Sequence, residues 1–248
     1  MDRSLEPLMD NRTEQLADGV WRVEVTTYVN AYVLANDGCG DAEGLTLVDT
    51  GTPRSGPRLV RSIRLMGLDP RAVGDVLLTH WHADHAGSAA RFARSSAAPT
   101  VWVGEGDLAV VREGLRPPVP PRRDTTALGR PLSRLVPPPP GVPAVSGLAD
   151  GARLEAAGGI QVVASPGHTP GHLAYLVASR GVLLTGDALL NVLFLSRGPR
   201  LLRSARSIEQ DTIKRLAGLE FDLLAFGHGP PLLKRARERL AALARVSR

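Results

Sequence analysis

The sequence contains a single cysteine, Cys39, among its 248 residues. One cysteine allows no internal disulfide, so a metal centre in this chain would have to use other side chains. Long apolar runs are also missing: the longest, at residues 188–195, is interrupted by Asn191 and falls short of the roughly 20 residues of a membrane span. Residues 1–20 hold no apolar stretch long enough for a signal peptide. We therefore expect a cytoplasmic protein that makes no contact with a membrane.

Aromatic residues are scarce, at 4% of the chain, and only two of the 30 basic residues are lysines. Arginines gather between residues 112 and 134, and such a cluster can attract an anionic substrate or a nucleic-acid backbone. No aromatic residues alternate with these arginines to form a surface on which single-stranded bases would stack. A nucleic-acid partner is therefore not expected, whereas an anionic small-molecule substrate stays open.

Histidine is present in an unusual pattern. Three of the six histidines lie with Asp84 within a few residues, directly after the apolar run 76–78. His80 and His82 are two residues apart, so at the end of a strand their side chains would leave the same face and close on one ion. Asp84 and His85 lie in the turn beyond, where the backbone can direct them at a second ion. The alternative for this stretch is a histidine-rich surface turn.

The remaining histidines, His168, His172 and His228, lie among glycine and proline residues. Such tight turns bring the backbone close to a ligand and often carry binding residues on a rigid scaffold. Asp49 and Asp187 each follow a short apolar run in the same way. Loops with aspartate or histidine thus follow five strand-like runs, so we expect these side chains to contribute to one site.

With these five motifs in this order, the chain resembles the metallo-β-lactamase superfamily, and most of all its glyoxalase II-like and lactonase-like hydrolases. The resemblance covers residues 30–230 approximately. It implies an α+β fold, a four-layer αββα sandwich in which two mixed β-sheets pack face to face between flanking helices. The pattern is specific for the fold and the metal site, but not for the substrate.

The resemblance also implies the ligands of two ions. These ligands are histidines and aspartates: His80, His82 and His168 for the first ion, Asp84, His85 and His228 for the second, and Asp187 as a bridge between them. Asp49 and His172 would support the ligands rather than bind metal. Ligation by nitrogen and oxygen without sulfur suits zinc, with two ions per chain, and also accepts iron or manganese.

Apolar runs predict the strands of two sheets. They lie at residues 21–27, 31–34, 45–48 and 75–78 in the first half and at 161–164, 173–177, 181–184 and 221–225 in the second. Apolar residues at helical spacing predict helices at 58–66 and 231–246. We expect an N-terminal extension at 1–18 and one domain at 19–248.

Two further segments are candidates for the rim of the site. Residues 115–145 are rich in proline and arginine, and we interpret them as an insertion that forms either a partial lid or a plain surface loop. Residues 189–203 follow Asp187 and include Val192, Leu193 and Phe194. These apolar side chains can line a substrate pocket, pack in the core or form the contact of a homodimer.

Two closely spaced ions activate a bridging hydroxide for attack on a polarised carbonyl, with Asp84 or a metal-bound water returning the proton. The sequence therefore predicts a zinc-dependent hydrolase of an ester, thioester or lactone in a small molecule. An iron-loaded site that uses three histidines for persulfide oxidation is an alternative, as is a phosphodiesterase or nuclease of the same fold. A non-catalytic binding protein would have lost ligand positions, and none is lost here.

Differences in sequence from well-known superfamily members narrow the range of expected substrates. One type of superfamily β-lactamase has cysteine in the fourth motif, where this chain has Asp187, and another lacks both that cysteine and a bridging carboxylate. We therefore expect little or no β-lactam hydrolysis. Only 20 residues follow His228, too few for the helical glutathione-binding domain of glyoxalase II. No tyrosine follows Asp187 closely, as it does in quorum-signal lactonases.

Overall fold

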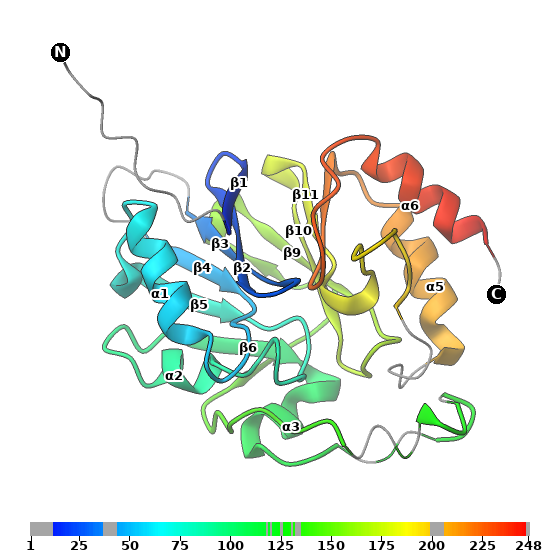
Figure 1. Cartoon of the computed structure of the whole chain (residues 1–248), viewed down its shortest axis with the longest axis horizontal. Coiled ribbons are helices and arrows are strands. Elements are labelled where there is room, and N and C mark those ends of the chain that lie inside the picture. The colour runs from blue at the N-terminus through cyan, green and yellow to red at the C-terminus, as the bar shows by residue number, and fades with distance from the viewer. Residues whose placement is uncertain are drawn as a thin grey trace.

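The computed structural model describes residues 12–36, 44–117, 119, 121–124, 126–129, 131, 135–198 and 206–246, so Cys39 lies outside the described residues. Its strands form two mixed sheets that face each other (Figure 1). The seven-stranded sheet has the order β1-β2-β3-β4-β5-β6-β7, antiparallel up to β4 and parallel beyond it. The five-stranded sheet has the order β12-β11-β10-β9-β8, in which β11 and β12 are the parallel pair.

The strands of the first sheet are β1 (Thr13–Ala17), β2 (Val20–Thr26), β3 (Val29–Ala35), β4 (Leu45–Val48), β5 (Val73–Leu77), β6 (Thr100–Gly104) and β7 (Ser146–Leu148). Those of the second are β8 (Arg153–Leu154), β9 (Ile160–Ala164), β10 (Leu173–Val177), β11 (Val182–Leu184) and β12 (Leu223–Ala225). The α-helices are α1 (Gly56–Leu65), α2 (Ala89–Ala93), α3 (Leu108–Glu113), α5 (Arg206–Ala217) and α6 (Ala236–Arg245). Short 3-10 turns lie at η1 (Pro70–Ala72), η2 (Glu105–Asp107), η3 (Ala156–Gly158), η4 (Ala178–Arg180) and η5 (Gly186–Ala188).

Three apolar clusters separate four layers. One lies between the sheets and contains Leu34 of β3 and Tyr175 of β10. A second joins the seven-stranded sheet to α1, and Val33, the neighbour of Leu34, belongs to it because successive side chains of a strand point to opposite faces. The third joins the five-stranded sheet to α5 and α6. The α+β sandwich expected from the resemblance is confirmed.

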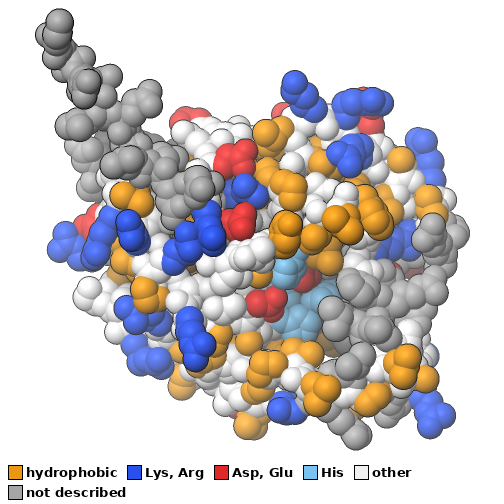
Figure 2. All heavy atoms as spheres, viewed as in Figure 1, with side chains coloured by type: hydrophobic (Ala, Val, Ile, Leu, Met, Phe, Trp, Pro, Cys, Tyr) orange, Lys and Arg blue, Asp and Glu red, His pale blue; other side chains and the backbone are white. Residues whose placement is uncertain are grey.

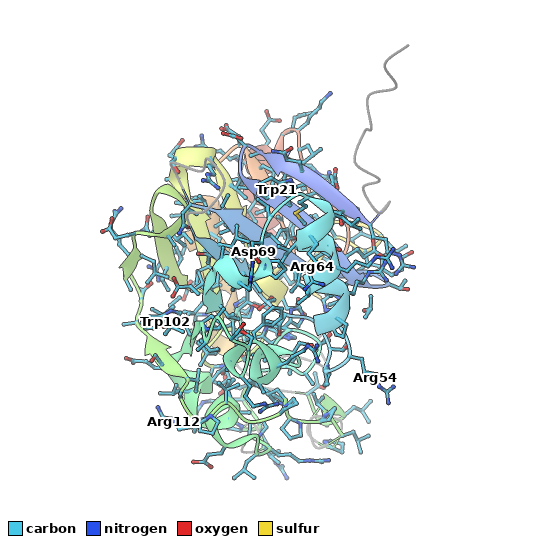
Figure 3. All side chains as sticks on the ribbon, turned by 90° about the vertical axis from the view of Figure 1, so that its left-hand side faces the viewer. Trp21, Arg54, Arg64, Asp69, Trp102 and Arg112 are labelled. Carbon is cyan, nitrogen blue, oxygen red and sulfur yellow. The ribbon has the colours of Figure 1, made fainter. Side chains whose placement is uncertain are left out.

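Helix α1 covers the outer face of the seven-stranded sheet. Its buried residues include Leu59 and Ile63, which are one helical turn apart and face the sheet. Figure 3 looks onto α1, with Trp21 of β2 beside it and Arg54 directed away from the protein. Trp21 packs against the same apolar cluster as Leu59. This amphipathic pattern explains why the sequence predicted the helix.

All eight strands predicted from apolar runs are present, with ends shifted by a few residues. Strand β1 lies inside the segment expected to be an extension at 1–18 and pairs with β2, whereas the domain boundary itself stays a prediction. Strands β6, β7 and β8 and helices α2, α3 and α5 were not predicted. Of the described residues, none form a helix long and apolar enough to cross a membrane.

The proline-rich segment at 115–145 begins just after α3. Gly114 ends that helix in a left-handed conformation with φ 67°. At the other end of the segment Val142 and Val145 are buried in the cluster beneath the seven-stranded sheet, and the Val142 N–H donates to the Val111 carbonyl. This end is therefore part of the core packing, and a lid formed by the rest stays a prediction.

Candidate metal centre

Every predicted site residue lies in a loop that follows a strand. Asp49 follows β4, His80 to His85 follow β5, His168 follows β9, Asp187 follows β11 and His228 follows β12. The parallel pairs β4–β5 and β11–β12 direct these loops to the same edge of the sandwich. Figure 2 shows the histidines together on one face of the molecule, with acidic side chains beside them.

Three ring nitrogens of the first predicted set converge. His82 Nδ1 lies 3.0 Å from His80 Nε2 and 2.8 Å from His168 Nε2. Zinc–nitrogen bonds of 2.0–2.1 Å in a tetrahedral site place neighbouring nitrogens roughly 3.3 Å apart, which is close to these separations. The three atoms therefore fit the ligation of a single ion.

The second predicted set converges in the same way. His228 Nε2 lies 3.2 Å from His85 Nε2 and 3.3 Å from Asp84 Oδ2, and His85 Nε2 lies 3.7 Å from Asp84 Oδ2. Of these three residues Asp84 has the most exposed side chain, at 40%, whereas that of His85 is completely buried. A ligand would thus approach this set from the side of Asp84.

Asp187 lies between the two sets. Its Oδ2 is 3.6 Å from His168 Nε2 and 3.2 Å from His228 Nε2, and its Oδ1 is 3.5 Å from His85 Nε2. Oδ1 is buried and has no hydrogen-bond partner among the residues that the structure describes. A buried carboxylate oxygen without a partner is unfavourable unless a cation completes its environment, so the donor set fits a metal-ligating role.

The charge states differ between the two sets. Burial lowers the pKa of His80 and His168 well below the usual value and that of His82 to about 4, so these rings are neutral and able to ligate. Burial also opposes protonation of His85 and His228, but the Asp187 and Asp84 carboxylates outweigh it and raise the pKa to about 9 and about 11. The carboxylates of Asp84 and Asp187 thus attract positive charge, which protons on His85 and His228 can supply and which a bound cation would supply in their place.

Asp49 orients two of the histidines. Its Oδ2 accepts a hydrogen bond from His85 Nδ1 at 2.9 Å and another from the Thr79 hydroxyl at 2.8 Å. The Thr79 oxygen in turn lies 3.0 Å from His80 Nδ1 and, because its own proton is donated to Asp49, accepts a hydrogen bond from the His80 N–H. Each ring is thereby fixed in the tautomer that leaves Nε2 available to a metal. Asp49 itself has φ 61°, a left-handed backbone that directs its carboxylate into the site.

His172 holds the Asp187 loop. Its Nε2 accepts a hydrogen bond from the Asp187 backbone N–H at 3.0 Å, and its Nδ1 lies 2.8 Å from the Ser165 hydroxyl. Burial lowers the pKa of His172 to about 3, in agreement with a neutral ring that accepts at Nε2. Both ring nitrogens contact protein partners, and a supporting role of His172 beside Asp187 stays a prediction.

Asp107 contacts two loops of the candidate site, and the sequence analysis did not identify it. It is fully buried at the end of η2, and its carboxylate accepts hydrogen bonds from the Trp81 N–H at 3.2 Å, the Thr169 hydroxyl at 2.7 Å and the Gly171 N–H at 2.9 Å. Trp81 lies between two ligand candidates and Thr169 follows His168. Asp107 therefore ties together the two loops of the first set.

Residues 25–228 of the chain match the Metallo-beta-lactamase superfamily. The chain belongs to this superfamily. In Bacillus subtilis (strain 168), the probable metallo-hydrolase YflN is 26% identical over 222 residues, which cover 82% of this chain and 83% of YflN. The uncharacterized protein YobT of the same organism is 26% identical over 162 residues, which cover 64% of this chain and 61% of YobT, less than two thirds of that relative.

Solved structures of superfamily members share the fold. The Rm3 metallo-beta-lactamase is 19% identical with a TM-score of 0.72, and the match covers 94% of this chain and 91% of Rm3. A metallo-beta-lactamase family protein from Thermus thermophilus is 26% identical with a TM-score of 0.66, covering 93% of this chain and 79% of that protein. These structural similarities concern the fold that positions the site.

The predicted site residues lie close together, but the physical reason given for the convergence of His80 and His82 was wrong. Strand β5 ends at Leu77, so His80 and His82 lie in a loop and do not converge through strand alternation. They converge because the loop turns, with His85 N–H and Ala86 N–H both donating to the His82 carbonyl. Thr79 and Asp107 have no distinctive sequence spacing, which is why only the folded structure reveals them.

Proposed function

We propose that the protein is a hydrolase that holds two divalent ions, preferably zinc, and acts on the ester, thioester or lactone carbonyl of a small molecule. One observation carries the proposal: two sets of three ligand atoms lie on either side of Asp187, whose buried Oδ1 has no hydrogen-bond partner in the described part of the chain. The second set supports two ions over one, since a site for a single iron would leave Asp84, His85 and His228 without a role.

The ions, when bound, would supply Lewis-acid activation of water and of the substrate carbonyl. His80, His82 and His168 would hold one ion, and His85, His228 and Asp84 the other. Among the described residues, these ligand groups consist of histidine and aspartate and include no cysteine. Water is accordingly the nucleophile that the site favours.

Asp84 is the proposed proton carrier. Its side chain is 40% exposed, against 7% for Asp187, so it is the carboxylate that a substrate can reach. Burial raises the pKa of Asp84, but His85 and His228 outweigh this and lower it below the usual value, so the group is ionised at neutral pH. It can accept the proton released by the attacking water and transfer it to the leaving oxygen, nitrogen or sulfur.

A substrate panel tests this function. Zinc-loaded protein is assayed with a thioester, a lactone, a phosphodiester and the β-lactam nitrocefin, beside Asp84→Asn and a surface control, Arg54→Gln. We expect carbonyl hydrolysis that Asp84→Asn reduces by about 10²-fold or more and that the control leaves unchanged. Faster turnover of nitrocefin or of the phosphodiester than of any thioester or lactone would contradict the proposed substrate class.

A further inference from the structure

Apolar side chains are exposed near the candidate metal centre. The exposed fraction is 91% for Leu193, 68% for Phe194, 52% for Tyr28 and 39% for Val192. Figure 2 shows hydrophobic side chains gathered next to the histidines. Exposed apolar groups that adjoin a polar site are typical of a surface that takes a ligand. We call these four residues the apolar rim.

Backbone hydrogen bonds attach the apolar rim to the turn of His228. The Gly229 N–H donates to the Tyr28 carbonyl at 3.1 Å, and the Asn191 N–H, next to Val192, donates to the His228 carbonyl at 3.1 Å. Residues Val29 and His228 also form an isolated antiparallel bridge. The rim therefore borders the second set of ligand candidates.

The rim is held in a defined shape. Leu190 and Ser196 exchange two backbone hydrogen bonds of 2.9 Å, which close the loop that carries Leu193 and Phe194. Tyr28 has φ 62°, a left-handed backbone that is unfavourable for a bulky aromatic residue. Strain of this kind persists where the surroundings impose it and is concentrated at functional sites.

The chemistry of the rim points to an uncharged occupant. Residues 188–196 include no charged side chain. Covering the four exposed side chains would bury roughly 500 Å², against about 800 Å² per partner in a stable interface between proteins. The rim alone is thus better matched to part of a small molecule than to a second copy of the chain.

We infer that the apolar rim binds the aliphatic or aromatic acyl group of a substrate whose carbonyl lies at the metal centre. This inference rests on the proposed hydrolytic function and names the substrate class. Each methylene group that leaves water on binding strengthens the interaction by up to about fourfold. The preference for long acyl chains should therefore depend on Leu193 and Phe194.

The test compares zinc-loaded wild-type protein with the double variant Leu193→Ser/Phe194→Ser, whose exposed positions should tolerate serine. Substrates are p-nitrophenyl esters from acetyl to octanoyl. We expect kcat/KM of the wild type to rise with chain length and that of the variant to rise much less, so that the ratio of octanoyl to acetyl kcat/KM is smaller in the variant. Leu233→Ser is the matched control, because Leu233 is also an exposed leucine, at 53%. Its neighbour Leu232 forms a bridge with Leu224 of β12 and not with the turn of His228.

Binding provides a second readout that needs no turnover. In calorimetry, the wild type should bind octanoate more tightly than acetate. In the double variant, the affinities for octanoate and acetate should differ by less than about threefold. Equal chain-length dependence in both proteins would overturn the inference, as would a wild-type dimer that the double variant dissociates in light scattering. Absence of ester hydrolysis together with chain-selective binding would overturn the proposed function alone.

Discussion

The orientation of each imidazole depends on the partner of its second nitrogen. Thr79 provides that partner for His80, since its O–H donates to Asp49 and its oxygen accepts from the His80 Nδ1–H. Removal of the hydroxyl would leave the buried His80 N–H without an acceptor, which is unfavourable by about 1–3 kcal/mol. Thr79 thus acts on metal binding without contact to the metal.

Thr79→Val should therefore lower zinc affinity about 10- to 100-fold, while Thr79→Ser, which keeps the hydroxyl that contacts His80, should bind zinc as the wild type does. Competition with a chromophoric chelator measures both. Equal affinities for the valine and serine variants would show that the hydroxyl does not orient His80.

Asp107 makes a pH-dependent contribution to stability. Burial raises its pKa from 3.8 to about 6, although Thr169, Gly171 and Trp81 lower it through hydrogen bonds. Between pH 3.8 and about 6, Asp107 is therefore protonated in the folded state but ionised in the unfolded state. The contribution of Asp107 to the free energy of unfolding decreases as the pH rises through this range.

The unfolding free energy of the wild type relative to Asp107→Asn should accordingly fall by about 2 kcal/mol between pH 4 and pH 7. Urea unfolding in EDTA measures the difference without metal binding, and groups common to both proteins cancel. A difference that stays constant across this range would contradict the pKa of Asp107 stated above.

The loops that carry the ligands are fixed by close packing at glycine. In the loop after β12, a Cβ at Gly227 would contact Asp187 Oδ1 and His85 Cε1. The Asn30 N–H donates to the Gly227 carbonyl at 2.9 Å, so this loop cannot move away without losing a bond to β3. A side chain at position 227 would therefore displace both ligand candidates, Asp187 and His85.

Gly227→Ala should weaken zinc binding strongly and leave the far-ultraviolet circular dichroism spectrum unchanged. Gly218→Ala is the control, because a Cβ there would meet its nearest atom, the Arg215 carbonyl oxygen, at an ordinary 3.4 Å. Zinc titration by calorimetry compares the two. Normal zinc binding by Gly227→Ala would mean that the loop has more freedom than its contacts indicate.

An element could be predicted from the sequence when its pattern of apolar residues differed clearly from that of the flanking residues. Strand β10 is apolar along its whole length and helix α1 has one apolar face, so both were predicted. Strand β8 has two residues and takes its conformation from pairing with β9, which no local pattern reveals. The ligand candidates were found because histidine is rare, whereas Asp107 depends on contacts with Trp81 and Gly171 that arise only on folding.

The candidate centre joins both halves of the molecule. His80, His82 and His85 follow a strand of the seven-stranded sheet, whereas His168 and His228 follow strands of the five-stranded sheet. An ion held by residues from both sheets binds the folded state and not the unfolded one. Zinc should therefore stabilise the whole chain in proportion to its occupancy.

Removal of metal with EDTA should lower the melting temperature of the wild type by several degrees, and zinc should restore it. The same treatment should shift the melting temperature of Asp187→Ala less, because the carboxylate between the two sets is lost while the three histidines of the first set remain. Differential scanning fluorimetry measures both shifts. Equal zinc-induced stabilisation of the two proteins would mean that zinc binds elsewhere.

The most direct test of the dinuclear centre is elemental analysis of dialysed protein, wild type beside His85→Ala. His85 belongs to the second set and not to the set of His80, His82 and His168. We expect about two zinc ions per wild-type chain and about one in the variant, since two complete tetrahedral sites require both sets. A wild-type content of one ion or fewer, in protein that keeps its fold, would contradict the dinuclear centre.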